Sequence, residues 1–205
     1  MPSARDITGL VLAGGRGLRM GGLDKGLQPF RGQPLARHCL SRLAVQVGTT
    51  ALNANRHLPQ YAAWGAPVWP DSADAGEFAG PLAGFLAGLE HCQTPYLCTV
   101  ACDTPLFPTD LVQRLAQALD SQGCDLAMAA AIEEDAQVRN QPVFCLIKAT
   151  QRESLRAFIA GGGRKIDTWT AAERAARVVF DRPHDDPRAF FNANTLEQLR
   201  QLERS

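Results

Sequence analysis

Residues 7–26, "ITGLVLAGGRGLRMGGLDKG", decide the fold expected of this chain. The first part, 7–13, is mainly apolar and predicts a short buried strand, which a glycine pair ends at once. The stretch 12–26 holds six glycines, three cations and one carboxylate. Glycines let the backbone approach a polyphosphate with its N–H groups, and cationic side chains can neutralise the phosphate charge. A surface loop with ordinary solvated cations is the alternative interpretation.

This loop differs from both familiar phosphate-binding patterns. A Walker A loop ends in Gly-Lys-Ser/Thr, whereas Lys25 lies between an aspartate and a glycine. The dinucleotide pattern G-x-G-x-x-G fits at Gly15 and Gly17 but meets Met20 at its third place. We therefore expect a phosphate site of another kind, in which backbone amides act together with Arg19 and Lys25.

Composition excludes several classes of protein. The 205 residues carry 21 Lys plus Arg and 21 Asp plus Glu, so the formal net charge is zero. Such balance argues against a general nucleic-acid or membrane binder. The N-terminus does not resemble a signal peptide, and no run approaches the roughly 20 apolar residues of a membrane helix. We expect a cytoplasmic protein whose six cysteines are small reduced thiols rather than zinc ligands or disulfides.

Predicted strands and helices alternate along the chain. The expected strands are 7–13, 49–55, a short piece near 66–72, 96–103, 124–132, 141–148 and 176–180. The expected helices are 33–46, 80–92, 109–123, 151–163 and 194–202. Pro34 suits the first turn of one helix, and Thr109 and Gly123 suit the cap and the end of another. This order predicts one α/β domain over residues 1–205, with helices on both faces of a mostly parallel sheet.

Ligands of such sheets bind beyond the carboxyl ends of the strands. The predicted site therefore combines the glycine run with "NANRH" at 53–57, "PDS" at 70–72 and "CDTP" at 102–105. Asp103 leaves a buried strand there, and a lone carboxylate beside bound phosphates suits Mg²⁺. A plain turn or helix-capping aspartate is the alternative interpretation.

Two further side chains are candidates for contacts with a nucleoside. Asn53 could hydrogen-bond a base or a ribose, although an asparagine-rich turn explains it equally well. Asp71 could accept the two adjacent donors of guanine, contact a ribose, or form an Asx turn. His57 is expected to be a solvated loop residue without a catalytic role.

Other motifs allow two interpretations each. Gly80, Gly84 and Gly88 lie on one helix face, either for close packing on the sheet or to flank a nucleobase. The segments 161–169 and 139–142 could form further polar or anion-binding loops, the first alternatively being a helix C-cap. Near the C-terminus, a capping box is predicted from either Asn194 with Glu197 or Thr195 with Gln198.

In this order, the motifs "LAGGRGLRMGGLDKG", "NANRH", "PDS", "GPLAG", "CDTP" and "FFNANT" resemble those of the molybdenum cofactor guanylyltransferase family. The resemblance covers nearly the whole chain. It implies a three-layer Rossmann-like nucleotidyltransferase that uses Mg²⁺ and GTP. Such an enzyme joins GMP to the phosphate of molybdenum-molybdopterin and releases pyrophosphate. Acceptor molybdoenzymes or chaperones are further possible partners, and nucleic acid and membrane are not expected.

The resemblance also assigns roles to residues. The implied GTP-binding residues are Leu12, Ala13, Gly14, Gly15, Lys25, Asn53, Asp71 and Asp103. Asp103 would also bind Mg²⁺, and Arg19, Lys25 and Asp103 would be catalytic. Asn192 and Asn194 would lie in a C-terminal, pterin-binding part, with the nucleotide in the N-terminal part.

Three rival functions stay open from the sequence. A cytidylyltransferase acting on the same pterin would differ only in the loops around the base. The spacing of the motifs does not decide whether these loops prefer GTP or CTP. A sugar-nucleotide synthase of similar fold usually needs a longer chain. A carrier that hands over the cofactor would need an exposed docking patch, for which Trp64 and Trp169 are candidates.

Overall fold

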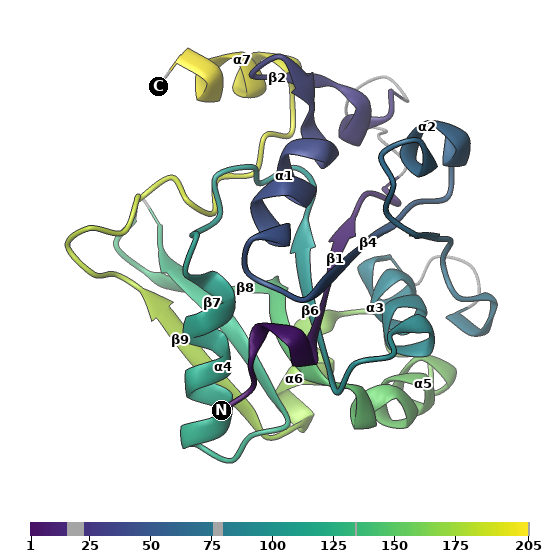
Figure 1. Cartoon of the computed structure of the whole chain (residues 1–205). Helices are drawn as coiled ribbons and strands as arrows, with labels where there is room; N and C mark the ends of the chain where they lie inside the picture. The colour runs from purple at the N-terminus through teal and green to yellow at the C-terminus, as the bar shows by residue number, and fades with distance from the viewer. Residues whose placement is uncertain (16–22, 76–79, 134, 205) are drawn as a thin grey trace.

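The computed structural model describes residues 1–15, 23–75, 80–133 and 135–204 (Figure 1). Its centre is a seven-stranded sheet in the order β5-β4-β1-β6-β8-β7-β9. The strands are β1 Ile7–Leu12, β4 Thr49–Asn53, β5 Val68–Trp69, β6 Tyr96–Ala101, β7 Leu126–Ile132, β8 Val138–Lys148 and β9 Ala175–Phe180. Only β8 runs antiparallel to its neighbours in this sheet. The predicted mostly parallel α/β sheet is confirmed.

Helices cover both faces of the sheet. They are α1 Leu35–Ala44, α2 Leu58–Ala62, α3 Pro81–His91, α4 Leu111–Ser121, α5 Arg152–Ala160, α6 Ile166–Ala172 and α7 Leu196–Arg204. Side chains of α1 and α4 belong to one hydrophobic cluster, and those of α3, α5 and α6 belong to a second. None of the described helices is long and apolar enough to cross a membrane.

The apolar run of β1 follows from this layering. Leu10 and Val11 are both fully buried, although successive side chains of a strand point to opposite faces. Leu10 contributes to the cluster under α3, and Val11 to the cluster under α1 and α4. A strand covered on both faces therefore favours apolar side chains at successive positions.

Two local predictions at helix starts are wrong. The helix predicted from residue 33 begins at Leu35, because Gln33–Pro34 forms a short strand, β3, that pairs with β2, Pro29–Phe30. The two residues between these strands have positive φ, which makes a tight turn. The second error is Thr109, which was expected to cap α4.

Instead, Asp110 lies at the cap position of α4 without a side-chain capping bond. The first helical amide, that of Leu111, is bonded to the carbonyl of Pro108, so the preceding turn supplies the partner. Gly123 ends the helix with φ of 63°, as predicted. Helix α6 was not predicted from the sequence at all.

The last helix, α7, packs against residues from the first part of the chain. Leu199 and Leu202 of α7 pack with Phe30, Leu35 and Leu106 in a separate hydrophobic cluster. Figure 1 shows α7 beside β2, far in sequence but adjacent in space. This packing holds the segment before α7 close to the segments that follow β1 and β6.

Candidate active site

The site lies at the carboxyl ends of three neighbouring parallel strands. In the sheet register Leu12, the last residue of β1, pairs with Asn53 of β4 on one side and with Ala101 of β6 on the other. The residues that follow these strands therefore meet at one edge of the sheet. This brings together the start of the glycine run, the "NANRH" segment and Asp103, as predicted.

Lys25 is the centre of the first polar cluster. Its ammonium forms an ion pair with Oδ2 of Asp103 at 2.9 Å and donates to Oδ1 of Asn194 at 3.1 Å. The three residues come from the beginning, middle and end of the chain. The sequence predicted each of them separately, and the structure places them in contact.

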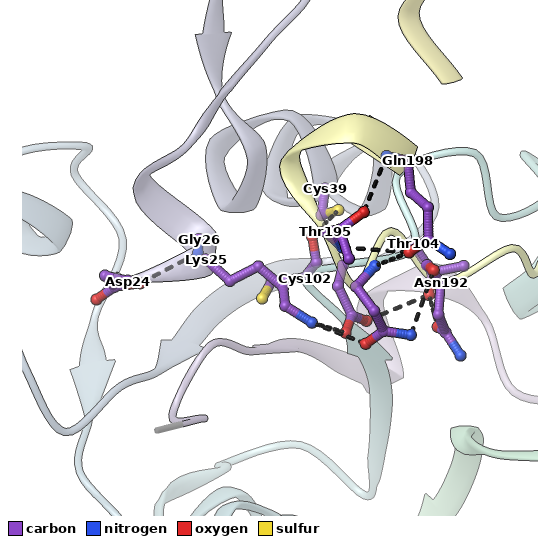
Figure 2. Close-up of polar contacts among 11 residues, drawn as sticks. Asp24, Lys25, Gly26, Cys39, Cys102, Thr104, Asn192, Thr195 and Gln198 are labelled. Carbon is purple, nitrogen blue, oxygen red and sulfur yellow. Dashed lines mark hydrogen bonds and ion pairs between the residues drawn. The ribbon is translucent and has the colours of Figure 1, made fainter. Parts of the chain in front are cut away.

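The C-terminal asparagines are fixed to the loop that carries Asp103. The hydroxyl of Thr104 donates to Oδ1 of Asn192, and the amide of Ala193 donates to the carbonyl of Asp103 at 2.9 Å. Next in the chain, Thr195 and Gln198 exchange side-chain bonds with each other's amides in a capping box (Figure 2). Of the two predicted boxes, the structure forms this one.

A buried carboxylate, Asp24, precedes the lysine and was not predicted to have a role. Asp24 is 7% exposed, and its Oδ1 accepts from the amide of Gly26 at 3.1 Å and from the hydroxyl of Tyr61 at 2.6 Å. It is the cap of the short 3-10 helix Lys25–Leu27. The Asp24 cap could have been inferred from its place before the helix, but no local pattern indicates Tyr61.

The nucleoside candidates form a network of their own. Asn53 is buried, and its amide nitrogen donates to the carbonyl of Trp69 at 3.0 Å and to Oδ1 of Asp71 at 2.9 Å. Asn55 donates to Oδ2 of Asp71 at 2.7 Å and accepts from the Asp71 amide at 2.8 Å. The two asparagines thus fix the Asp71 carboxylate, and a direct contact between Asn53 and a nucleoside stays a prediction.

Two glycines make room for this network. A Cβ atom at Gly14 would lie 2.9 Å from Nδ2 of Asn55 and 3.0 Å from Oδ1 of Asn53. At Gly84 of α3 it would lie 2.5 Å from Oδ1 of Asn53. A Cβ atom at Gly88 would lie equally close to the side chains of two leucines. The packing interpretation of the glycines in α3 is therefore confirmed for Gly84 and Gly88.

A family model for the MobA-like NTP transferase domain matches residues 9–178, which include the whole strand-end site except the C-terminal asparagines. The chain belongs to this family. A relative named molybdenum cofactor guanylyltransferase from Acidovorax ebreus (strain TPSY) is 61% identical over 208 residues, covering 99% of this chain and 98% of the relative. One of the same name from Methylibium petroleiphilum is 57% identical over 206 residues, covering 99% of this chain and 98% of the relative. The resemblance drawn from the motifs is confirmed.

Solved structures share the fold of this MobA-like chain. Molybdopterin-guanine dinucleotide biosynthesis protein A from Archaeoglobus fulgidus has a TM-score of 0.77 at 21% identity, covering 96% of this chain and 97% of that one. The 4-diphosphocytidyl-2C-methyl-D-erythritolsynthase from Anaerococcus prevotii has a TM-score of 0.72 at 12% identity, with 98% of each chain covered. At such identities the likeness establishes the fold, and the close relatives establish a nucleotidyltransferase.

The glycine run itself is only partly described. Arg19 lies in 16–22, outside the described residues, so its catalytic role stays a prediction. At the near end, the amide of Ala13 donates to the carbonyl of Asn53, and Arg56 donates to the carbonyl of Gly15. Within the described residues the amides of Gly14 and Gly15 meet no acceptor. A contact between these two amides and a phosphate stays a prediction.

The other candidate loops belong to the fold of this nucleotidyltransferase. Gly162 ends α5 with φ of 89°, and Arg164 donates to the carbonyls of Ile159 and Gly163. The helix C-cap interpretation of this segment is confirmed. The loop expected at 139–142 is wrong, because these residues lie within β8 and residues 139–141 pair with β7.

The two tryptophans proposed for a carrier's docking patch are not exposed. Trp169 is 1% exposed and donates from Nε1 to Ser154 at 3.2 Å. Trp64 is half-buried against the core and packs edge-on to Tyr61. Trp169 therefore cannot contribute to a docking patch, and Trp64 exposes only part of its indole.

Cysteines at the site are buried thiols. Cys102 directly precedes Asp103, and burial raises its pKa, as does the neighbouring carboxylate. Burial also raises the pKa of Cys39, which donates from Sγ to the Cys102 carbonyl. Thiols with raised pKa values are poor nucleophiles, so these cysteines act in packing.

Asp103 fits a metal ion only together with a substrate. Among the described residues, no group of three or more His, Cys, Asp or Glu side chains is placed to hold a metal. Asp103 is partly exposed, pairs with Lys25 and follows β6, the strand that neighbours β1. One carboxylate completed by phosphate oxygens and water is the usual coordination of Mg²⁺.

Proposed function

We propose that this nucleotidyltransferase transfers GMP from GTP to the phosphate of molybdenum-molybdopterin, giving molybdopterin guanine dinucleotide and pyrophosphate. The observation that carries the proposal is the contact of Lys25 with both Asp103 and Asn194. It joins a phosphate-binding segment to a predicted metal ligand and to the C-terminal segment. The names of the close relatives support the choice of GTP and pterin.

The chain needs no general base for this reaction. The nucleophile is a phosphate oxygen of the pterin, which is already ionised at neutral pH. Catalysis then consists of positioning this oxygen in line with the α-phosphoryl group and of neutralising the charge of the leaving pyrophosphate. The site supplies cationic and amide donors for this purpose and leaves its buried thiols unused.

Lys25 is suited to the neutralising role. A lysine ammonium has three donors, and Asp103 and Asn194 take two of them in the described chain. The third can donate to a phosphate oxygen without loss of either contact. Mg²⁺, when bound, supplies Lewis-acid stabilisation of the phosphate oxygens. Asp103 is its proposed protein ligand, and it also fixes the lysine.

Two groups of side chains at the site are assigned to the two substrates. The network of Asn53, Asn55 and Asp71 lies beside β4, and we assign it to the nucleoside. Asn192 accepts from Thr104 and Asn194 accepts from Lys25, and we assign both asparagines to the pterin. Asp71, fixed by both asparagines, presents a preorganised acceptor to guanine or ribose.

Pyrophosphate release tests the proposal. The full chain is incubated with Mg²⁺, molybdenum-molybdopterin and, in turn, GTP, CTP, ATP or UTP, with no acceptor protein. We expect release with GTP to exceed release with the others by at least one order of magnitude. A preference for CTP would replace the guanylyl assignment by a cytidylyl one. If none of the four nucleotides gave pyrophosphate release, the carrier would be supported instead.

A further inference from the structure

Segment 55–61, which follows β4, contacts the glycine run on both sides of its undescribed part. Before that part, Asn55 reaches the carbonyl of Gly14 at 3.4 Å and Arg56 that of Gly15 at 3.1 Å. After it, Tyr61 of α2 donates to Asp24 at 2.6 Å. The segment that arranges the nucleoside side therefore also contacts the residue directly before Lys25.

The contact between Tyr61 and Asp24 is closely packed and buried. Tyr61 is fully buried, and a Cβ atom at Gly26 would lie 2.4 Å from its hydroxyl oxygen. Burial raises the pKa of Tyr61, and its hydrogen bond with Asp24 raises it further, so the phenol stays protonated and donates. No other side chain of the described chain donates to the Asp24 carboxylate.

The Asp24 side chain fixes the position of the Lys25 backbone. One carboxylate oxygen receives both the tyrosine hydroxyl and the amide of Gly26, so the residues on either side of Lys25 are fixed to the same point. Figure 2 shows the side chains of Asp24 and Lys25 leaving the backbone in opposite directions, Lys25 extending toward the loop of Thr104. An anchored backbone and a directed side chain give the ammonium a defined position.

We infer that Tyr61 is a positioning residue for catalysis, which acts through Asp24 to hold the Lys25 ammonium at the reacting phosphates. The inference rests on the proposed function, because it assigns Lys25 to the phosphates. Tyr61 itself is too deeply buried to touch a substrate. A shift of Lys25 weakens stabilisation of the transition state more than ground-state binding. We therefore expect the shift to lower kcat and to leave KM nearly unchanged.

Tyr61→Phe tests the inference, with Tyr96→Phe as the matched control. These are the only tyrosines of the chain, and Tyr96 begins β6 at the end opposite to Asp103. We expect kcat for pyrophosphate release to fall about tenfold in Tyr61→Phe, the usual effect of one hydrogen bond. The KM for GTP should change less than twofold, and Tyr96→Phe should match the unmodified chain.

A double-mutant cycle distinguishes positioning from a general loss of structure. If Tyr61 acts through Lys25, then Tyr61→Phe lowers kcat in the unmodified chain but has no further effect in a Lys25→Ala background. Equal losses in both backgrounds, or a kcat within twofold of the unmodified chain, would overturn the inference. Thermal unfolding of each variant shows that the compared proteins are folded.

A second variant serves if Tyr61→Phe fails to fold. Asp24→Ser keeps a good helix-capping side chain but is too short to reach the tyrosine hydroxyl. Asp24→Ser should lower kcat by the same factor in the unmodified chain and have no further effect in the Lys25→Ala background. Normal turnover of Asp24→Ser would again overturn the inference. Failure of the unmodified chain to release pyrophosphate would instead count against the proposed function, so the two failures are distinguishable.

Discussion

At the scale of single residues, the account depends on Lys25 and Asp103. They are 78 positions apart and form an ion pair at the edge of the sheet. Both side chains are partly exposed, about one fifth in each case, so they are accessible to a ligand. Their substitution should therefore affect turnover more than folding.

Lys25→Ala and Asp103→Ala should each lower turnover by about 10²–10³, because Lys25 is proposed to contact the reacting phosphates directly and Asp103 to act on them through the metal ion. The measurement is the initial rate of pyrophosphate release from GTP, together with thermal unfolding. Lys165→Ala, which removes an exposed lysine before α6, is the control and should change neither quantity. A fully active Asp103→Ala protein would contradict the assignment of this carboxylate to the metal.

Sequence reasoning found these residues because each follows a recognisable strand or glycine run. It missed Asp24 and Tyr61 because their bond joins positions 37 apart, and buried phenol groups leave no local pattern. Asn55 was also passed over as part of a turn, although it fixes Asp71 with two hydrogen bonds. Contacts between loops depend on the whole fold.

At the scale of elements, α3 is the helix that shapes the nucleoside side. A Cβ at Gly84 would meet Asn53, whereas a Cβ at Gly88, one turn further, would meet only Leu10 and Leu97. The two glycines thus have the same packing role toward the sheet. They differ because the neighbour of Gly84 belongs to the candidate site, whereas the neighbours of Gly88 belong to the hydrophobic core.

Gly84→Ala should lower kcat/KM for GTP by about tenfold or more, because displacement of Asn53 misplaces Asp71. Gly88→Ala is the matched variant and should leave kcat/KM unchanged. Both should lower the unfolding temperature, since overpacking costs about 1–3 kcal/mol and improved helix propensity returns only about 1 kcal/mol. Equal kinetics in the two variants would show that Asn53 does not act at the site.

Most long elements could be predicted from their periodicity and their glycine or proline boundaries. Strands β2 and β3 could not, because two residues are too few to show alternation. The antiparallel direction of β8 also escaped prediction, since an apolar run has the same composition in either direction. Helix α6 is short and follows a glycine cluster that dominates the local pattern.

At the scale of the whole molecule, a buried ion pair joins α4 to the segment that follows β9. Arg114 donates from Nη1 to both carboxylate oxygens of Asp185 at 2.9 Å and lies over the ring of Phe180. Burial alone would raise the pKa of Asp185. Hydrogen bonds from Arg114 and from the Arg182 amide outweigh it and hold this pKa below its usual value of 3.8.

This lowered pKa predicts acid sensitivity. Because folded Asp185 binds protons less readily than unfolded Asp185, its stabilisation is complete above the usual value of 3.8 and is lost as the pH falls further. At pH 7, Asp185→Asn should cost about 3 kcal/mol, since it removes the carboxylate closest to the buried Arg114 guanidinium and leaves it only the Asp110 carboxylate at 3.8 Å and the Val179 carbonyl. Urea unfolding should show the difference from the unmodified chain narrowing below pH 4.

The control for this prediction is Asp181→Asn, an exposed aspartate in the same segment. Asp181→Asn should leave the free energy of unfolding unchanged at pH 7 and at pH 3. A difference between Asp185→Asn and the unmodified chain that stays constant from pH 7 to pH 3 would show that the carboxylate charge does not stabilise the fold.

The central claim is that the chain forms a bond between GMP and molybdopterin at the site of Lys25 and Asp103. The most direct test is the mass of the product from GTP, Mg²⁺ and molybdenum-molybdopterin, without an acceptor protein. The account predicts a species heavier than the pterin by one GMP unit, with one pyrophosphate released for each. Recovery of both substrates unchanged, or an adduct formed only from CTP, would contradict it.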